Sequence, residues 1–495
     1  MNDFDKLRKL TGEVADLAAA FAVLEWDQQV YMPPGAAADR ACQMETLAGE
    51  LHRRITAPAV GQLLDRIDPE SYPEDSFERA FLRKTRRRFE RERKVPARLA
   101  SAQARAAARA HTAWVTAREK ADYRIFAPHL AELLDLAREY AALFAAPGES
   151  LYDPLLDLYE PGMSSAALDR VFAPLRRELS GIAREAAERT ASWLLPAGGK
   201  FNAAGQVAFA RETVRRLGYD FRRGRLDLTI HPFTTSFELA DVRITTAVRA
   251  DSPVSCLLSA VHECGHALYE QGIDPAFDRT PLADGASLGF HESQSRFWEN
   301  QVGRSREFWE YLWSKFRKRF AAAASHMEFE PFYRSILRVT PSEIRTEADE
   351  VTYNLHILLR YDLEKEMLAG TVNLRDLPEI WNAKMRESLG VSPRNDTVGV
   401  LQDIHWAGGS FGYFPTYALG NLIAAQLWSI ARRRLPDLPE EIRRGNFRPL
   451  LDFLRETVHR HGAKYEPAEL LRRIAGSPEV DPACFLSYLR EKYLA

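Results

Sequence analysis

Residues 261–269 read Val-His-Glu-Cys-Gly-His-Ala-Leu-Tyr, which is a His-Glu-x-x-His pattern. The surrounding sequence predicts a helix, because apolar residues recur at helical spacing at Leu257, Leu258, Val261 and Leu268. Before them, Asp251-Ser252-Pro253 is typical of a helix start, and Gly272 after them is typical of a helix end. The whole pattern is therefore expected on one helix.

His262 and His266 stand four residues apart, so both imidazoles leave the same face of that helix. Two neutral imidazoles at this separation can bind one divalent ion at about 2.0–2.1 Å, as a tetrahedral zinc site requires. Glu263 lies beside them, where it can accept a proton from the attacking water. The alternative is an amphipathic helix with two partly buried histidines and a solvated glutamate.

The third ligand is predicted in residues 289–300, Gly-Phe-His-Glu-Ser-Gln-Ser-Arg-Phe-Trp-Glu-Asn. In metallopeptidases that have a His-Glu-x-x-His helix but no third histidine ligand, a glutamate from a later helix closes the site. Glu292 is the candidate here. Two histidines and one glutamate leave the fourth position open, which is typical of a catalytic zinc site. The alternative for Glu292 is an ordinary exposed carboxylate, and His291 is interpreted as a capping or core residue. Four residues on stands Arg296, which offers no carboxylate to orient a ligand histidine.

Charge and composition argue against several classes of function. The chain has 495 residues, 46% of them hydrophobic, and its 67 basic residues nearly balance 69 acidic ones. The formal net charge of −2 creates no overall field that attracts nucleic acid or an anionic membrane. A cluster of basic residues between positions 83 and 94 contains only one aromatic residue, Phe89. Proteins that bind single-stranded nucleic acid stack the bases on several aromatic rings. The cluster is interpreted as a solvated helix face.

Nothing in the sequence predicts export or membrane insertion. The first residues, Met1 to Lys6, lack the charged-then-apolar profile of a secretion signal. No apolar run approaches the length of about 18 residues needed to span a bilayer. The cysteines are scattered without a Cys-x-x-Cys pair, which is typical of a reducing compartment, and Cys264 is interpreted as a packing residue that faces away from the two histidines. We expect a cytoplasmic protein that does not bind membranes.

Helical periodicity runs through most of the chain, beginning with residues 3–31, 37–55 and 76–94. The pattern changes once, because residues 226–237 and 242–248 are rich in β-branched and aromatic residues and predict a β-hairpin. The edge of such a sheet can pair with an extended peptide through main-chain hydrogen bonds. No repeat or linker divides the chain, so we expect a single catalytic domain over residues 1–495.

Six short motifs follow one another along the chain: HPF at His231–Phe233, DVRIT at Asp241–Thr245, HECGH at His262–His266, HESQS at His291–Ser295, IRTEAD at Ile344–Asp349 and GVLQDIHW at Gly399–Trp406. Together with Trp-Asp at Trp26 and Tyr-Glu-Pro-Gly at Tyr159, they extend over nearly the whole sequence. In this set the chain resembles the thermostable carboxypeptidase Taq family of metallocarboxypeptidases. Six motifs in family order are far more specific than one pentapeptide.

The resemblance implies a mainly α fold, a large helical, saddle-like zincin with a deep cleft and a small β-hairpin or sheet beside the His-Glu-x-x-His helix. It also implies a homodimeric enzyme that removes single residues from peptide C-termini with broad specificity and uses zinc or cobalt. Two other classes stay open. One is a metallo-endopeptidase or oligopeptidase with the same zinc core, and the other is a helical scaffold with a degenerate site, against which the intact metal residues argue.

The reaction needs further residues beside the metal ligands. Glu263 is predicted to act first as general base and then as general acid toward the leaving amine. The oxyanion needs a hydrogen-bond donor besides the metal, and the candidates are His405 and Tyr417. Tyr413 competes equally with Tyr417, and packing in the core is the alternative for each of these aromatic residues.

An exopeptidase must also hold the terminal carboxylate of its substrate. An arginine fork suits this, because it offers two parallel donors to a planar anion. The family motif at residues 344–349 points to Arg345, and the alternative is an ion pair with Asp349 on the same helix face. Arg243 and His231 are weaker candidates beside the strand that binds the substrate.

Overall fold

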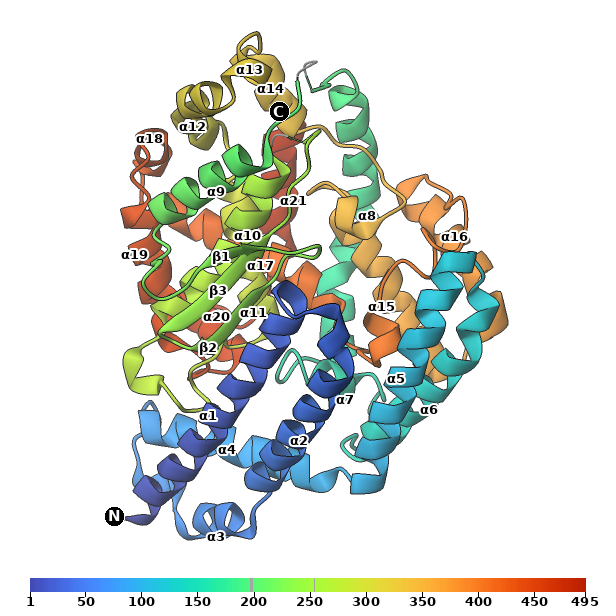
Figure 1. The fold of residues 1–495 in the computed structure, drawn as a ribbon, viewed down its shortest axis with the longest axis vertical. Coiled ribbons are helices and arrows are strands. Elements are labelled where there is room, and N and C mark those ends of the chain that lie inside the picture. Colours follow the sequence, from blue (N-terminus) through green and yellow to red (C-terminus); the bar gives the residue numbers. More distant parts are fainter. Residues whose placement is uncertain (196–198, 253) are drawn as a thin grey trace.

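The structure is a computed structural model that describes residues 1–195, 199–252 and 254–495. It is mainly helical, with one small sheet (Figure 1). The first helices are α1 (Asp3–Val30), α2 (Ala37–Ile55), α3 (Pro58–Arg66), α4 (Phe77–Lys94), α5 (Ala97–Lys120) and α6 (Ala127–Ala142). The helices expected from residues 3, 37 and 76 are confirmed as α1, α2 and α4. In the described part of the chain, no helix is long and apolar enough to cross a membrane.

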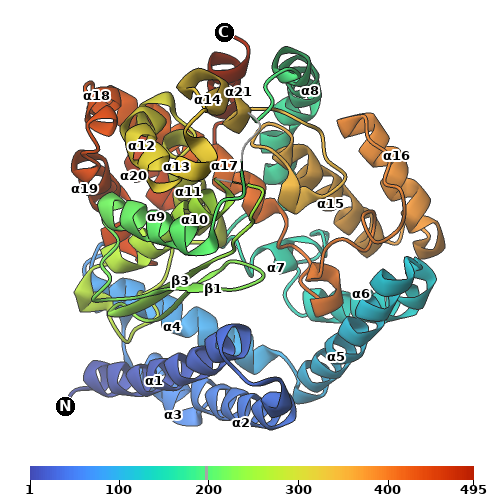
Figure 2. The same cartoon turned by 45° about the horizontal axis from the view of Figure 1, so that its top comes forward.

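The helices in the centre of the chain are α7 (Asp153–Leu156), α8 (Ser165–Thr190), α9 (Ala203–Leu217), α10 (Ser255–Gly272) and α11 (Leu288–Arg296). Helices α10 and α11 carry the candidate metal ligands. The remaining helices are α12 (Arg306–Arg319), α13 (Ala321–Ala324), α14 (Phe329–Ile336), α15 (Tyr353–Ala369), α16 (Leu377–Leu389), α17 (Pro415–Arg434), α18 (Leu438–Arg443), α19 (Arg448–Thr457), α20 (Pro467–Ala475) and α21 (Pro482–Tyr493). Figures 1 and 2 both place the sheet between α1 and α10.

The sheet has three strands in the order β1-β3-β2, which are Leu226–Leu228, Asp241–Thr246 and Thr234–Glu238. Strands β2 and β3 form the expected hairpin, but the prediction of one continuous strand over residues 226–237 is wrong. Pro232 has no amide hydrogen for a ladder, and the chain turns around it, so that β1 pairs in parallel with the other side of β3. Strand β2 is thereby left at the edge of the sheet.

Helix α11 lies between α10 and α17, and a glycine permits each close approach. A Cβ at Gly265 of α10 would collide with the carbonyl of Gln294 in α11. On the other side, a Cβ at Gly420 of α17 would collide with the side chain of Glu292. A glycine inside a helix destabilises it by about 0.5–1 kcal/mol relative to alanine, and here that loss brings three helix backbones together.

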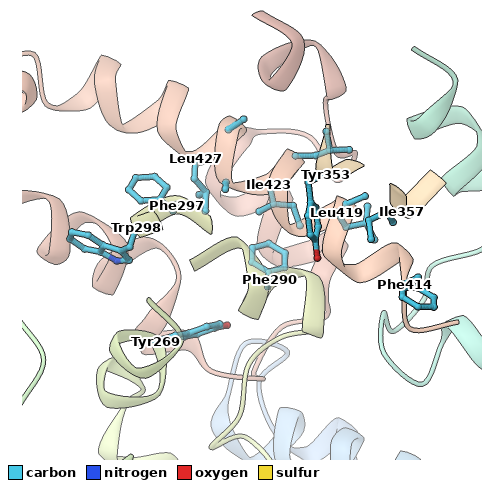
Figure 3. Packing of buried hydrophobic residues seen from close by; sticks show 14 of the residues in the cluster. Tyr269, Phe290, Phe297, Trp298, Tyr353, Ile357, Phe414, Leu419, Ile423 and Leu427 are labelled. Atoms are coloured by element: carbon cyan, nitrogen blue, oxygen red, sulfur yellow. The ribbon is translucent and has the colours of Figure 1, made fainter. Parts of the chain in front are cut away.

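Apolar packing fixes α11 against α17. Phe290 and Phe297 lie among Ile423, Leu427 and other fully buried residues of α17 (Figure 3). Trp428 of α17 meets Phe297 edge to face, with ring centroids 5.6 Å apart. One continuous cluster of buried residues extends from Phe4 to Tyr493, so the central helices share their core with both ends of the chain.

Two local predictions are wrong. The cap expected at Asp251 and Ser252 does not form, because α10 begins at Ser255 and its N-cap residue Val254 offers no side-chain acceptor; Pro253 lies outside the described residues. Residues 344–349 do not form a helix either. They contain a single 3-10 turn, Arg345–Glu347, followed by extended backbone at Ala348.

Candidate metal centre and active site

The two histidines of α10 and Glu292 of α11 converge on one point. The nearest ligand atoms of His262, His266 and Glu292 all lie within 4.8 Å of one another. The Nε2 atoms of His262 and His266 lie 3.6 Å and 3.4 Å from Glu292 Oε2. Two imidazole nitrogens and one carboxylate oxygen are a donor set of a catalytic zinc site, so these residues fit a divalent ion.

Glu292 is buried and held by its own helix. Ser295 Oγ donates to Glu292 Oε2 at 2.8 Å, and Arg296 Nε donates to Glu292 Oε1 at 2.6 Å. Burial alone would raise the pKa of this carboxyl, but Arg296 and the two histidines outweigh burial and hold the pKa well below its usual value. The alternative of an ordinary exposed carboxylate is therefore wrong, and Glu292 faces the histidines as an anion.

A carboxylate orients His262 from behind. His262 Nδ1 lies 2.8 Å from Glu299 Oε2, and Glu299 also accepts from Arg296 at 3.1 Å and from Arg304 at 3.2 Å. Such a carboxylate fixes the tautomer and the ring orientation of a ligand histidine. Helical spacing pointed to position 296, four residues beyond Glu292, whereas Glu299 follows Glu292 by seven residues, in a π-helical turn at Phe297–Val302.

His266 is supported in a different way. Its Nδ1 lies 2.6 Å from Nδ1 of His291, and His291 Nε2 lies 2.6 Å from Glu270 Oε1. The interpretation of His291 as a capping or core residue is therefore incomplete, because its ring connects two polar groups. Cys264, by contrast, is buried and its Sγ points to the carbonyl of Val214, in agreement with a packing role.

Glu263 lies between the histidines and the sheet. Its carboxyl is buried, and burial raises its pKa above the ordinary value. Thr234, the first residue of β2, donates its hydroxyl to Glu263 Oε2 at 2.7 Å. This bond connects the proposed base directly to the edge strand β2. The sheet therefore lies beside the His-Glu-x-x-His helix, as predicted.

Strand β2 forms one wall of a cavity of about 790 Å³. Other walls come from alanines of α1, from residues 278–288 and from α4. Lys84, Arg87, Arg88 and Arg91 of the basic cluster face this cavity, so the interpretation of that cluster as a purely solvated face is only partly correct. An extended chain lying along β2 would pass through the cavity.

His405 and Tyr417 do meet in the structure. His405 Nε2 lies 3.1 Å from the hydroxyl of Tyr417, and the ring of Tyr413 lies 5.3 Å from the ring of each. Burial lowers the pKa of His405 to about 4, so this imidazole is neutral at pH 7. Burial also keeps the hydroxyls of Tyr413 and Tyr417 protonated, and each can donate a hydrogen bond.

Arg345 is buried beside this group and does not pair with Asp349. Its Nε donates to Asp403 Oδ1 at 2.9 Å, and its Nη1 donates to the hydroxyl of Tyr353 at 2.8 Å. Arg360 Nε donates to the second oxygen of Asp403 at 2.7 Å. Asp349 instead accepts from the amides of Val351 and Thr352. The alternative of an Arg345–Asp349 ion pair is wrong, because these residues do not share a helix.

Two arginines thus share one carboxylate. Among the described residues, no other carboxylate forms an ion pair with Arg345 or Arg360. Burial holds the pKa of the neighbouring His356 well below its usual value, which leaves that imidazole neutral. The cluster therefore carries one net positive charge in a buried place, and an anion would be stabilised there.

The two weaker candidates lie apart from this cluster. Arg243 on β3 pairs with its neighbour Asp241 at 2.7 Å and stacks on the rings of Trp26 and Phe237. His231 is exposed in the turn between β1 and β2. In the part of the chain that the structure describes, neither forms a hydrogen bond or an ion pair with His262, His266 or Glu292, and both stay predictions.

Comparisons with known proteins agree with the family resemblance of the sequence motifs. A family model described as carboxypeptidase Taq (M32) metallopeptidase matches residues 6–493. Thermostable carboxypeptidase 1 of Thermus thermophilus is 42% identical over 506 residues, which cover 99% of this chain and 98% of that protein. Carboxypeptidase 1 of Bacillus subtilis is 36% identical over 498 residues, covering 99% and 97%.

Solved structures show the same likeness. An M32 carboxypeptidase from Deinococcus radiodurans superposes with a TM-score of 0.93 at 39% identity, over 100% of this chain and 99% of that one. Trypanosoma cruzi metallocarboxypeptidase 1 has a TM-score of 0.95 at 35% identity, with the same coverage. These likenesses confirm the predicted fold class.

Proposed function

This chain belongs to the carboxypeptidase Taq (M32) metallopeptidase family, and we propose which of its residues perform the reaction. The protein is a metal-dependent carboxypeptidase that hydrolyses the C-terminal bond of peptides. The endopeptidase or oligopeptidase alternative is not favoured, because the curated relatives are carboxypeptidases.

His262, His266 and Glu292 would hold the metal ion. We propose zinc as this ion, with cobalt as the alternative. The observation that supports this ligand set is the convergence of three donors within 4.8 Å, of which Glu292 is buried and the two histidines are half-buried. When bound there, such an ion polarises the peptide carbonyl and makes water a better nucleophile. Glu299 holds the imidazole of His262 from behind, so this donor is already oriented before the ion arrives.

Glu263 accepts the proton of the attacking water and later passes it to the leaving amine. The hydroxyl of Thr234 fixes one of its oxygens, and its raised pKa suits a group that must both take and return a proton. Tyr417 donates a hydrogen bond to the oxygen that becomes negative, and His405 positions the Tyr417 hydroxyl. Tyr413 stays an equal competitor for Tyr417.

Arg345 binds the terminal carboxylate of the substrate. The support for this role is the uncompensated positive charge of the Arg345–Arg360–Asp403 cluster. The peptide upstream of the cleaved bond would extend along the free edge of β2 into the cavity, where His231 and Arg243 are secondary candidates for contacts.

A comparison of two peptides tests the proposal. One peptide ends in a free carboxylate and the other, of the same sequence, ends in an amide. We expect sequential release of single C-terminal residues from the acid, slow cleavage of the amide, and no cleavage of either after treatment with a chelator. Equal rates on the acid and the amide would contradict the exopeptidase function and favour an oligopeptidase.

The protein is further proposed to act as a homodimer in the cytoplasm, because the family resemblance implies a dimer and the cysteines are free and scattered. Light scattering coupled to size exclusion measures the assembly directly. A mass near the 56.2 kDa of one chain would contradict the dimer.

A further inference from the structure

A line of three polar side chains leads from His266 to the wall of the cavity. His266 Nδ1 lies 2.6 Å from His291 Nδ1, and His291 Nε2 lies 2.6 Å from Glu270 Oε1. The side chains of His266 and His291 are each 17% exposed, and that of Glu270 is 8% exposed. Glu270 also lines the 790 Å³ cavity beside β2.

The protons in this line can be assigned from the geometry. His266 directs Nε2 toward Glu292, so this nitrogen must be free of hydrogen to bind an ion and Nδ1 must carry the proton. His266 Nδ1 therefore donates to His291 Nδ1. His291 is then left with a hydrogen on Nε2, which donates to the carboxylate of Glu270. Only one tautomer of each histidine satisfies both bonds.

Helix geometry explains why a second imidazole is needed. Glu270 follows His266 by four residues on α10 and lies on the same face. The ring of His291 from α11 lies between them and closes the gap. It lies tilted against the ring of Tyr269, with centroids 5.3 Å apart, and Gly285 leaves room for it, because a Cβ at that position would collide with the imidazole. The imidazole is thus built into both helices.

We propose that His291 and Glu270 are positioning residues that hold His266 in its metal-binding tautomer and orientation. The inference rests on the proposed ligand set. His262 is held by a carboxylate directly, whereas His266 is held by a carboxylate through an imidazole. Removal of such a partner typically lowers metal affinity about 10- to 100-fold. His291 thereby acts on the metal without binding it.

Zinc affinity of the purified full-length protein tests the proposal, measured by competition with a chromophoric chelator. His291→Leu removes the acceptor for His266 Nδ1 and is expected to raise the dissociation constant about 10- to 100-fold. His291→Asn places an amide oxygen near the position of Nδ1 and is expected to restore most of the affinity. Glu270→Gln keeps an acceptor for His291 and is expected to fall between His291→Leu and the wild type.

A matched control separates this effect from general loss of packing. His459 is fully buried, its ring stacks at 5.3 Å on the same Tyr269, and it bonds to Gln294, but among the described residues it has no hydrogen bond or ring contact with a proposed ligand. We expect His459→Asn to leave the zinc dissociation constant within about two-fold of the wild type. The visible spectrum of the cobalt-loaded protein should change in His291→Leu and stay unchanged in His459→Asn.

The outcomes are distinct. A wild-type protein that takes up no zinc would contradict the proposed ligand set itself. Wild-type zinc uptake together with an unchanged dissociation constant in His291→Leu, or with equal losses in His291→Leu and His459→Asn, would overturn the role of His291. If His291→Leu does not fold, the comparison of Glu270→Gln with His459→Asn decides: a dissociation constant that rises only in Glu270→Gln supports the role of His291, and equal values in the two variants overturn it.

Discussion

Arg296 connects the proposed metal ligand Glu292 with Glu299, the carboxylate that bonds to His262. It donates to both carboxylates and stacks at 4.4 Å over the ring of Tyr353, whose hydroxyl accepts from Arg345. One buried side chain therefore joins the metal donors to the residues proposed to hold the substrate. Such a contact depends on which faces of α11 and α15 meet, and sequence spacing alone does not contain that information.

Replacement of Glu263 by glutamine tests the general base. The amide keeps the shape of the side chain and its contact with Thr234, but it cannot accept a proton from water. We expect Glu263→Gln to retain the metal and the fold while turnover falls about 10²- to 10⁴-fold. Metal analysis and steady-state kinetics check both parts. Activity within a few-fold of the wild type would assign the base to another group.

Arg345→Ala tests the carboxylate clamp when it is measured on two substrates. A charge-assisted hydrogen bond contributes roughly 1.5–3 kcal/mol, or about 10- to 100-fold in catalytic efficiency. The loss is expected on the free acid and hardly at all on the slow amide, because only the acid presents the anion. Equal losses on both substrates would mean that Arg345 only stabilises the cluster around Asp403.

Among the elements, periodicity predicted the helices and failed where a tertiary contact decides the local structure. The segment 344–349 reads as a helix, yet Arg345 turns toward Asp403, 58 residues away, and the Asp349 side chain accepts from the two amides just before α15. Glu299 could have been found at two helical turns beyond Glu292. His291 could not, because its role depends on the loop at Gly285 leaving space for its ring.

The start of α11 offers a prediction about pH. Glu160, which follows α7, is fully buried, accepts from the amide of Gly289 and bonds to Ser287; burial raises its pKa from 4.5 to about 7. Between these values the unfolded chain loses the proton while the folded chain keeps it. Stability contributed by the neutral carboxyl is therefore present below pH 4.5 and is lost as the pH rises through 7.

Glu160→Gln cannot ionise, so it removes this loss. In metal-free protein we expect variant and wild type to have equal midpoints of thermal unfolding at pH 4.5. At pH 8 we expect the midpoint of the variant to be a few degrees higher, because its free energy of unfolding is larger by up to about 3 kcal/mol. Glu364, whose pKa burial also raises to about 7, is present in both proteins and cancels. A difference that is the same at both pH values would contradict the titration of Glu160.

At the scale of the whole molecule, the last helix reaches the support of the metal centre. Lys492 Nζ and the hydroxyl of Tyr488 in α21 both donate to the carbonyl of Asn300, in the π-helical turn that carries Glu299. Phe4 of the first helix and Tyr493 of the last belong to one apolar cluster. These contacts support the proposal that residues 1–495 are a single catalytic domain.

If the chain is one domain, metal binding must stabilise all of it. A ligand present at 1,000 times its dissociation constant stabilises the folded state by about 4.1 kcal/mol. Because the donors come from α10 and α11, inside the shared core, we expect zinc to raise the unfolding midpoint by several degrees, equally for helix content and for tryptophan fluorescence. Trp26, Trp114 and Trp381 lie far along the chain from the ligands, so their signals report on distant segments. Two transitions, of which zinc shifts only one, would divide the chain into independent domains, and limited proteolysis of the metal-free protein would then locate the boundary.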